Sequence, residues 1–402
     1  MSKQKSQVTM LMIVGLVLFI IVSFVLYISK SAIKKQSQQN IKKTQETAID
    51  VQPIKEFIVK CIDKLAKDAI VLLGKQGGII YKSQGGTLED FIDTDEGIFF
   101  VKYKGLNVAY NIFPPRINAP DYPSQTFPFP TEKSNSEQYT GYFGEDKIPS
   151  LDASQGPQSI QTQIGSFIDN NIQSCTDLST FKNQGYEITM DNSKTEVSIG
   201  SSDISIKSKI STKITNTATK ETFSFDDFST KINIGLRDAY SFVKDIINSD
   251  VTDVKFNISD NINNKESLKI NLIKNIYSDS DRKIKADLVI ITDGKSLIYG
   301  TPLEYVFARR NRAPALHYIR KNSFAFPANY LINESDLFKK DSLKAEDPDE
   351  DDYAFNTYIG EFGTAKAQFP KKLDVNQLKF RIDVSDGTLS DYQIITVNRI
   401  AS

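Results

Sequence analysis

The densest group of residues that could do chemistry is the acidic segment AEDPDEDDYAF, from Ala345 to Phe355. Carboxylates this close in sequence repel one another unless solvent or a cation shields them. Ca²⁺ takes about six to eight oxygen ligands from carboxylates and carbonyls. The segment therefore indicates either a calcium site or a solvated acidic loop. The candidate calcium ligands are Asp347, Asp349, Asp351 and Asp352, with Glu346 and Glu350 among them.

The two cysteines, Cys61 and Cys175, form neither a CxxC motif nor a metal-ligand spacing. If this part of the chain lies outside the cytosol, the spacing favours one disulfide that closes a long loop. The alternative is two separate buried thiols.

Histidine occurs once, at His317, which excludes most catalysis and metal binding that depend on histidine. We interpret His317 as a structural residue. Ser179 and Lys182 fit S-x-x-K, but no SDN or KTG motif accompanies them. We therefore predict no catalytic residue and a protein that is not an enzyme.

The formal net charge of −1 gives no bulk attraction to nucleic acid, so we expect no nucleic-acid partner. A local basic cluster is formed by Arg309, Arg310 and Arg312. It favours pairing between two domains over an anion site.

The chain begins with a long apolar segment, Val8 to Ile28. About 20 apolar residues in a helix cross the hydrocarbon core of a bilayer. We therefore expect a single transmembrane helix at 8–28, after a short cytosolic segment at 1–7. Lysines follow the apolar segment and would place the body in the cytosol. The cysteine pair and the C-terminal domain at 311–402, described below, favour the opposite orientation. In that orientation the residues after the apolar segment form an extracellular body at the cell membrane.

The elements that follow are read from the spacing of apolar residues. Residues 29–74 are expected to be a helical stalk and an amphipathic helix that contains Cys61 and ends at Gly74. A second helix is expected from Ser159 to about Gln173, with Cys175 just beyond it. Alternating segments and one more helix predict an α+β ectodomain at 75–310, in which residues 114–157 form an irregular loop. Two N-x-S sequons, at Asn257 and Asn333, are compatible with export.

A hairpin pattern closes the chain, because FRIDVSDGTLSDYQIITV alternates apolar and polar residues on both sides of Asp386-Gly387. This segment and the acidic segment together resemble the cadherin-like and immunoglobulin-like β-sandwich repeats of prokaryotic surface proteins. The resemblance covers 311–402 and implies a β-sandwich, with Ca²⁺ bound by acidic residues in calcium-dependent members. Glu350 stands where these repeats usually have glycine, and the DxNDN-type linker element is missing.

The residues before the apolar segment, Lys5-Ser6-Gln7-Val8, resemble the class III signal of archaeal type IV pilin-like proteins. The resemblance implies cleavage after Ser6, with Gln7 as the new N-terminus, and assembly through the apolar helix. An uncleaved signal anchor is the alternative.

Together these features predict an α+β protein with an N-terminal transmembrane helix and stalk, a mixed ectodomain and a C-terminal cadherin-like or Ig-like β-sandwich. The expected function is adhesion to a protein or glycan surface partner, or attachment within the cell envelope. A pilin-like structural subunit that self-assembles is the alternative, and an exported hydrolase is a weaker one. Ca²⁺ is the expected cofactor if the acidic segment binds one.

Overall fold

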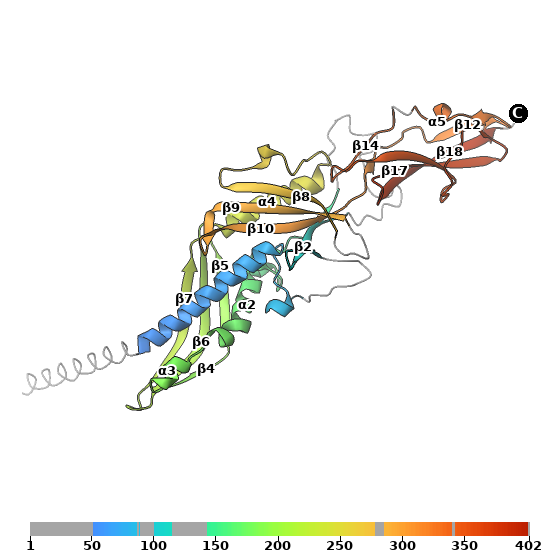
Figure 1. Ribbon diagram of the computed structural model, residues 1–402. Coiled ribbons are helices and arrows are strands. Elements are labelled where there is room, and N and C mark those ends of the chain that lie inside the picture. Colours follow the sequence, from blue (N-terminus) through green and yellow to red (C-terminus); the bar gives the residue numbers. More distant parts are fainter. Residues whose placement is uncertain are drawn as a thin grey trace, which may run out of the picture.

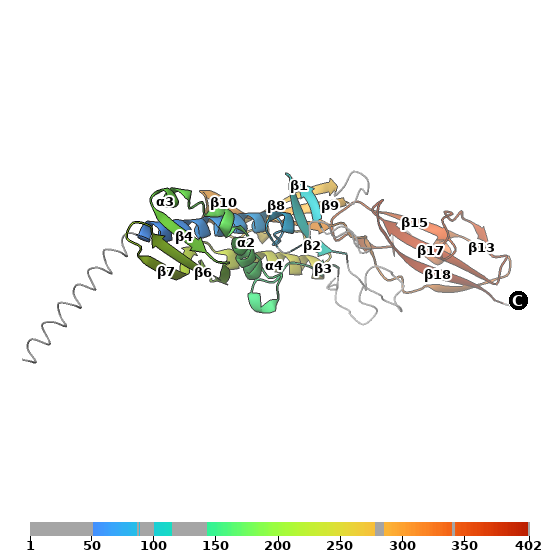
Figure 2. The same ribbon diagram turned by 90° about the horizontal axis from the view of Figure 1, so that it is seen from below.

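The computed structural model describes residues 51–86, 88, 100–114, 143–277, 285–339 and 342–400. They form an elongated molecule, with the first described residues at one end and the C-terminal strands at the other (Figure 1). A view turned by 90° shows the same elongation (Figure 2). The expected transmembrane segment Val8–Ile28 and the expected cleavage site at Ser6 and Gln7 lie outside the described residues.

A helix over residues 51–75, here called the long helix, runs along the body. Its apolar side chains recur every three or four positions and are almost fully buried, which confirms the predicted amphipathic face. Gly74 does not end the helix, which continues to residue 75. A Cβ at Gly74 would lie 2.4 Å from the backbone oxygen of Glu304, so glycine permits close packing of the helix on a strand. The buried face consists of Val51, Ile54, Ile58, Cys61, Ile62, Leu65, Ala66, Ala69, Ile70 and Leu73.

One antiparallel sheet of four strands packs against the first part of this helix, in the common core. Its central strand, β6, alternates buried and exposed residues over most of its length, as a sheet with one buried face requires. Two helices, α2 (Ile160–Cys175) and α3 (Ser179–Asn183), lie beside it. The strands are β4 (Tyr186–Met190), β5 (Lys194–Ile199), β6 (Ile204–Asn216) and β7 (Thr222–Ile232).

A second sheet of six strands covers the other part of the long helix, in the order β1-β2-β10-β9-β8 with β3 paired to β2. Strand β10 pairs parallel with β2 and antiparallel with β9. Helix α4 (Leu236–Thr252) packs near β2, β3 and β9. The strands are β1 (Phe100–Tyr103), β2 (Leu106–Phe113), β3 (Glu145–Asp146), β8 (Leu268–Tyr277), β9 (Lys285–Ile298) and β10 (Thr301–Arg310), and short 3₁₀ helices lie at Lys82–Gln84, Ala153–Gln155 and Asn261–Asn263.

The described residues from 315 onward, here called the C-terminal domain, form one sheet of four strands in the order β12-β18-β17-β15. Two ribbons of two strands, β11-β14 and β13-β16, cover the buried face of this sheet with helix α5 (Glu334–Leu337). The predicted hairpin is confirmed as β17 and β18, although four residues rather than two join them. The strands are β11 (Ala315–Leu316), β12 (Ser323–Pro327), β13 (Leu331–Ile332), β14 (Ala345–Glu346), β15 (Ala354–Ile359), β16 (Lys371–Lys372), β17 (Gln377–Ser385) and β18 (Ser390–Ile400).

The expected fold class is wrong for the described residues. Strands hold 42% of them and helices only 26%, so the protein is mainly β. The reason is the length of β6, β7 and β9, which run without a break over 13, 11 and 14 residues. The C-terminal domain is likewise not a sandwich of two full sheets, because its second layer is made of two short ribbons and α5.

No helix among the described residues is both long enough and apolar enough to cross a membrane.

Candidate functional site

Two arginines fill the junction between the body and the C-terminal domain. Arg309 near the end of β10 is 1% exposed, and Arg312 just after this strand is fully buried. Successive side chains of a strand point to opposite faces, and Arg310 accordingly lies with its guanidinium 6.0 Å from the centre of the Phe113 ring. The predicted basic cluster therefore divides, and only two of its three arginines enter the junction.

Arg309 binds carboxylates from both sides of the junction. Its Nη1 lies 2.8 Å from Oδ1 of Asp250 in α4, and its Nη2 lies 2.7 Å from Oδ2 of Asp287 in β9. Its Nε lies 3.1 Å from Oδ1 of Asp349, which belongs to the C-terminal domain. One guanidinium thus joins a helix, a strand and the acidic segment.

Arg312 makes the closest connection to the C-terminal domain. Its backbone N–H donates to Oδ2 of Asp349 at 2.6 Å, and its Nη2 donates to Oδ1 of the same carboxylate at 2.8 Å. Nη2 also lies 2.9 Å from Oδ2 of Asp250 and donates to the backbone oxygen of Pro348 at 2.9 Å. We call Asp250, Asp287, Arg309, Arg312 and Asp349 the junction network.

The charges in this network support one another. Burial alone would raise the pKa of Asp349, but Arg312 and Arg309 outweigh burial and hold this pKa below its ordinary value. Burial opposes the charged form of both guanidiniums too, yet Asp250 and Asp349 raise the pKa of each. Removing one partner from such a buried network leaves an uncompensated charge and typically lowers the free energy of unfolding by about 3 to 5 kcal/mol. The network therefore fixes the junction.

Further polar contacts surround the network. The Nζ of Lys285 in β9 lies 2.5 Å from Oδ2 of Asp351. The Nζ of Lys274 in β8 lies 3.0 Å from Oε2 of Glu350. On the other side of the domain, the Asn311 amide donates to Asp386 in the turn between β17 and β18 at 2.7 Å. The body thus contacts the C-terminal domain through both the acidic segment and the hairpin turn.

Asp347 is the most unusual of the predicted calcium ligands. It is 8% exposed, and its Oδ1 accepts the backbone N–H groups of Asp349 and Asp351 at 2.8 and 3.1 Å. Burial, with the charge of Asp349 beside it, raises the pKa of Asp347 to about 7. Among the described residues, no hydrogen-bond partner reaches its Oδ2.

The four predicted calcium ligands therefore have different roles. Asp349 pairs with arginines, Asp351 pairs with Lys285, Asp347 caps the backbone of its own segment, and Asp352 is exposed. Within the part of the chain that the structure describes, no group of three or more His, Cys, Asp or Glu residues is placed to hold a metal ion. Calcium binding by this segment stays a prediction from the sequence.

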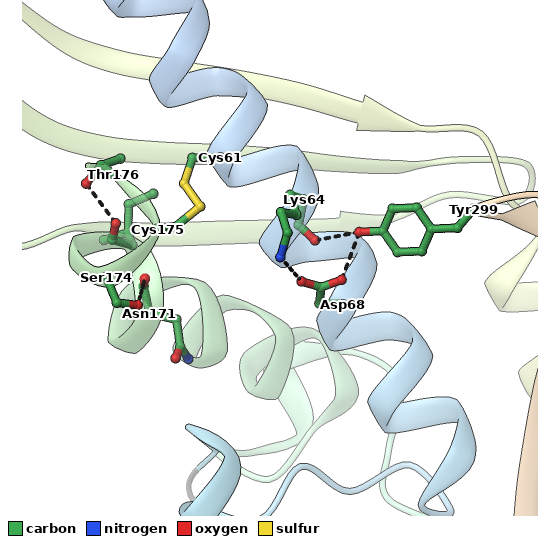
Figure 3. The surroundings of a disulfide bond; sticks show 9 residues. Cys61, Lys64, Asp68, Asn171, Ser174, Cys175, Thr176 and Tyr299 are labelled. Carbon is green, nitrogen blue, oxygen red and sulfur yellow. Dashed lines mark hydrogen bonds and ion pairs between the residues drawn. A yellow bond between two sulfur atoms is a disulfide. The ribbon is translucent and has the colours of Figure 1, made fainter. Parts of the chain in front are cut away.

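The predicted disulfide between Cys61 and Cys175 is confirmed, with 5.9 Å between the two Cα atoms. It joins the buried face of the long helix to the last residue of α2 (Figure 3). A second connection lies one to two turns further along the helix, where the Tyr299 hydroxyl donates to Asp68 Oδ1 at 2.8 Å and lies 3.2 Å from the backbone oxygen of Lys64 (Figure 3). Tyr299 occupies the turn between β9 and β10, so the long helix is connected to α2 by the disulfide and to the six-stranded sheet by Tyr299.

Other candidate residues do not come together. His317 is partly buried beside Glu346, and burial lowers its pKa. Ser179 and Lys182 lie in the exposed helix α3, where the Ser179 backbone N–H donates to Asp177 Oδ1 at 3.0 Å. A cavity of about 340 Å³ between the long helix and the β9–β10 turn includes Lys75 and Glu304 in its lining, and we assign it no catalytic role.

Two residues of the network, Asp250 and Asp287, were missed by the sequence analysis. Asp250 lies at helical spacing from Ile246 and Ile247 on the apolar face of α4, and Asp287 stands between Ala286 and Leu288 in β9. A charged residue in such a position is rarely buried unless it is paired. That signal, with two nearby arginines in the sequence, could have found the network.

Neither a scan against known protein families nor a search of the curated proteins finds a match for this chain.

Proposed function

We propose that this protein is a membrane-anchored surface protein that presents its C-terminal domain for adhesion or for attachment within the cell envelope. The membrane partner in this proposal is the apolar segment Val8–Ile28. The observation that carries the proposal is the position of the C-terminal domain, at the opposite end of an elongated molecule from the first described residues of the long helix (Figure 2).

The far end of the C-terminal domain offers a contact surface. Leu331, Val375 and Ile400 are 55%, 44% and 47% exposed. Two backbone hydrogen bonds hold their segments together: Leu373 N–H donates to Tyr330, and Arg399 N–H donates to Asn376. Exposed apolar side chains gathered at one place mark interaction sites. We call Leu331, Val375 and Ile400 the tip residues.

Two features of the body suit this role. The disulfide is the kind of bond that persists outside the cytosol, which supports an extracellular body. The junction network buries its charges at the connection between body and C-terminal domain, which keeps the domain directed away from the long helix. A rigid connection suits a protein that must hold a contact surface at a distance.

Adherence of cells tests the proposal. A strain that lacks the protein is complemented with the wild-type chain, with the triple variant Leu331→Ser, Val375→Ser, Ile400→Ser, or with Ile262→Ser. Ile262 is 83% exposed in the body and serves as the matched control. We expect adherence to be restored by the wild type and the control and lost in the triple variant. Equal adherence of the strain with and without the protein would contradict the proposal.

The second candidate function is a structural subunit of a filament. The observation that favours it is the long helix, whose apolar face lies along the body and whose first described residues stand at one end of the molecule (Figure 1). Electron microscopy of native material distinguishes the two functions. Long filaments would support a subunit, and isolated particles would support a single anchored protein.

A further inference from the structure

The chain contains two N-x-S sequons in its described residues, Asn257-Ile258-Ser259 and Asn333-Glu334-Ser335. Both asparagines are exposed. An N-x-S/T sequon on the surface of an exported protein is an acceptor for an N-linked glycan. The two sites differ in the hydrogen bonds that each asparagine side chain makes.

The first sequon lies in the connection between α4 and β8. Ile258 is buried, at 1% exposed, and holds the segment on the body while its two neighbours project outward. The Asn257 Oδ1 accepts the Ser259 hydroxyl at 2.6 Å and the Ser259 backbone N–H at 2.8 Å. Its Nδ2 donates no hydrogen bond to any residue that the structure describes. The acceptor nitrogen is therefore exposed and free.

The second sequon is used to begin a helix. Asn333 is the N-cap of α5, its side chain accepts the backbone N–H of Asp336, and its own backbone N–H donates to Asp336 Oδ2 at 2.7 Å. Its Nδ2 makes longer contacts with Asp336 Oδ2 and the Leu331 backbone oxygen, at 3.4 and 3.5 Å. Ser335 lies inside the helix. A glycan on this amide would break the Nδ2 contacts and, because Ser335 lies inside α5, recognition of the sequon would require the first turn of the helix to open.

We propose that Asn257 is the acceptor for an N-linked glycan in the folded protein and that Asn333 is not. In this reaction the Asn257 Nδ2 attacks C1 of the first sugar of a lipid-pyrophosphate-linked oligosaccharide. The N–C1 bond forms, the bond from C1 to the phosphate oxygen breaks, the lipid pyrophosphate leaves, and the amide loses one proton to a base of the transferase. In the cell this inference rests on the proposed function, because the donor and the transferase act outside the cytosol.

The direct test uses the purified folded chain, a single-subunit oligosaccharyltransferase and a lipid-pyrophosphate-linked oligosaccharide. Peptide mass spectrometry measures the modified fraction of each asparagine over time. An N-cap stabilises a helix enough to change the equilibrium between its closed and open first turn about tenfold. We therefore expect Asn257 to react at least about tenfold faster than Asn333. After reduction and unfolding, we expect the two sites to react at similar rates.

Two variants of the same residue provide the control. Ser259→Thr keeps the sequon and should keep the modification, whereas Ser259→Ala keeps Asn257 but should abolish it. The inference is overturned if folded Asn333 reacts as fast as Asn257. It is also overturned if Asn257 reacts in the unfolded chain and not in the folded one.

Native material separates this inference from the proposed function. A glycan on Asn257 of chains from intact cells supports both. If the body proves to be cytosolic while Asn257 is still modified in vitro, the proposed function fails and the acceptor assignment stands. An unmodified Asn257 on an extracellular body, in cells that glycosylate other exported proteins, overturns the acceptor assignment alone.

Discussion

Arg312 holds Asp349 twice, because its backbone N–H and its guanidinium donate to the two oxygens of one buried carboxylate. Asp349 belongs to the C-terminal domain, whereas Arg312 lies two residues after the end of β10, a strand of the body's larger sheet. The pair therefore determines how the two parts of the molecule are connected.

Replacing Asp349 tests this connection. We expect Asp349→Ala to lower the free energy of unfolding by about 3 to 5 kcal/mol, because it leaves Arg309 and Arg312 buried without their shared partner. The exposed neighbour Asp352 is the matched control, and Asp352→Ala should change the value by less than about 0.5 kcal/mol. Denaturant unfolding followed by circular dichroism measures both. Equal stability of the two variants would show that the network does not hold the junction.

Gly144 offers a second test of the packing at the junction. A Cβ at this position would lie 3.0 Å from Val251 Cγ1 and 3.1 Å from Arg312 Nη1. We expect Gly144→Ala to cost about 1 to 3 kcal/mol, because well-packed interiors resist added volume. Gly294→Ala is the control, since its nearest contact would be an ordinary 3.7 Å. A thermal melt in which Gly144→Ala is no less stable than Gly294→Ala would contradict the packing described here.

The predictability of the fold from the sequence differs between local and distant features. Periodicity located the long helix, α2 and the β17–β18 hairpin, because each depends on the spacing of its own apolar residues. The pairing of Cys61 with Cys175 followed from having two thiols beside two helices. The partners of Arg309 could not be located in this way, because Asp250, Asp287 and Asp349 come from three distant segments that meet only after packing.

The disulfide should be a major part of the stability of the body. Closing a loop of more than 100 residues stabilises a fold by about 4 to 5 kcal/mol in the chain-entropy model, and removal typically costs about 2 to 5 kcal/mol. We expect the double variant Cys61→Ser, Cys175→Ser to have a free energy of unfolding lower than that of the wild type by an amount in this range. Alkylation of the unreduced native protein provides the chemical check. Labelling of both cysteines before reduction would mean that the bond is absent from the native protein.

The unusual carboxyl of Asp347 predicts a dependence of stability on pH. Its pKa is raised from 3.8 to about 7 in the folded protein, so the folded state holds this proton more tightly than the unfolded state. This contribution to stability is complete below about pH 4 and is lost as the pH rises through about 7. Asp347→Asn keeps the oxygen that caps the segment and removes the titration.

The measurement is therefore a comparison of two pH profiles. The free energy of unfolding of Asp347→Asn minus that of the wild type should increase by roughly 2 to 4 kcal/mol from pH 4 to pH 8. The reason is that the wild type loses the contribution of its raised pKa over this range, and one pKa unit corresponds to about 1.4 kcal/mol. Other carboxylates titrate in both proteins and cancel in the difference. Parallel profiles of wild type and variant would contradict the raised pKa.

Calcium provides a test of the acidic segment. Because Arg312 occupies both oxygens of Asp349 and Lys285 pairs with Asp351, we expect the melting temperature to be the same in calcium and in chelator, within about 1 °C. A rise of several degrees in calcium, lost in Asp347→Asn, would instead show that the segment binds the cation. Differential scanning calorimetry of the full chain distinguishes these outcomes.

Surface exposure of the C-terminal domain is the claim on which the proposed function depends most directly. Intact cells are treated with a protease that cannot enter them, and the released peptides are identified by mass spectrometry. We predict that peptides from 311–402 and from the body are released from intact cells. Release of these peptides only after the cells are broken would contradict the proposed function.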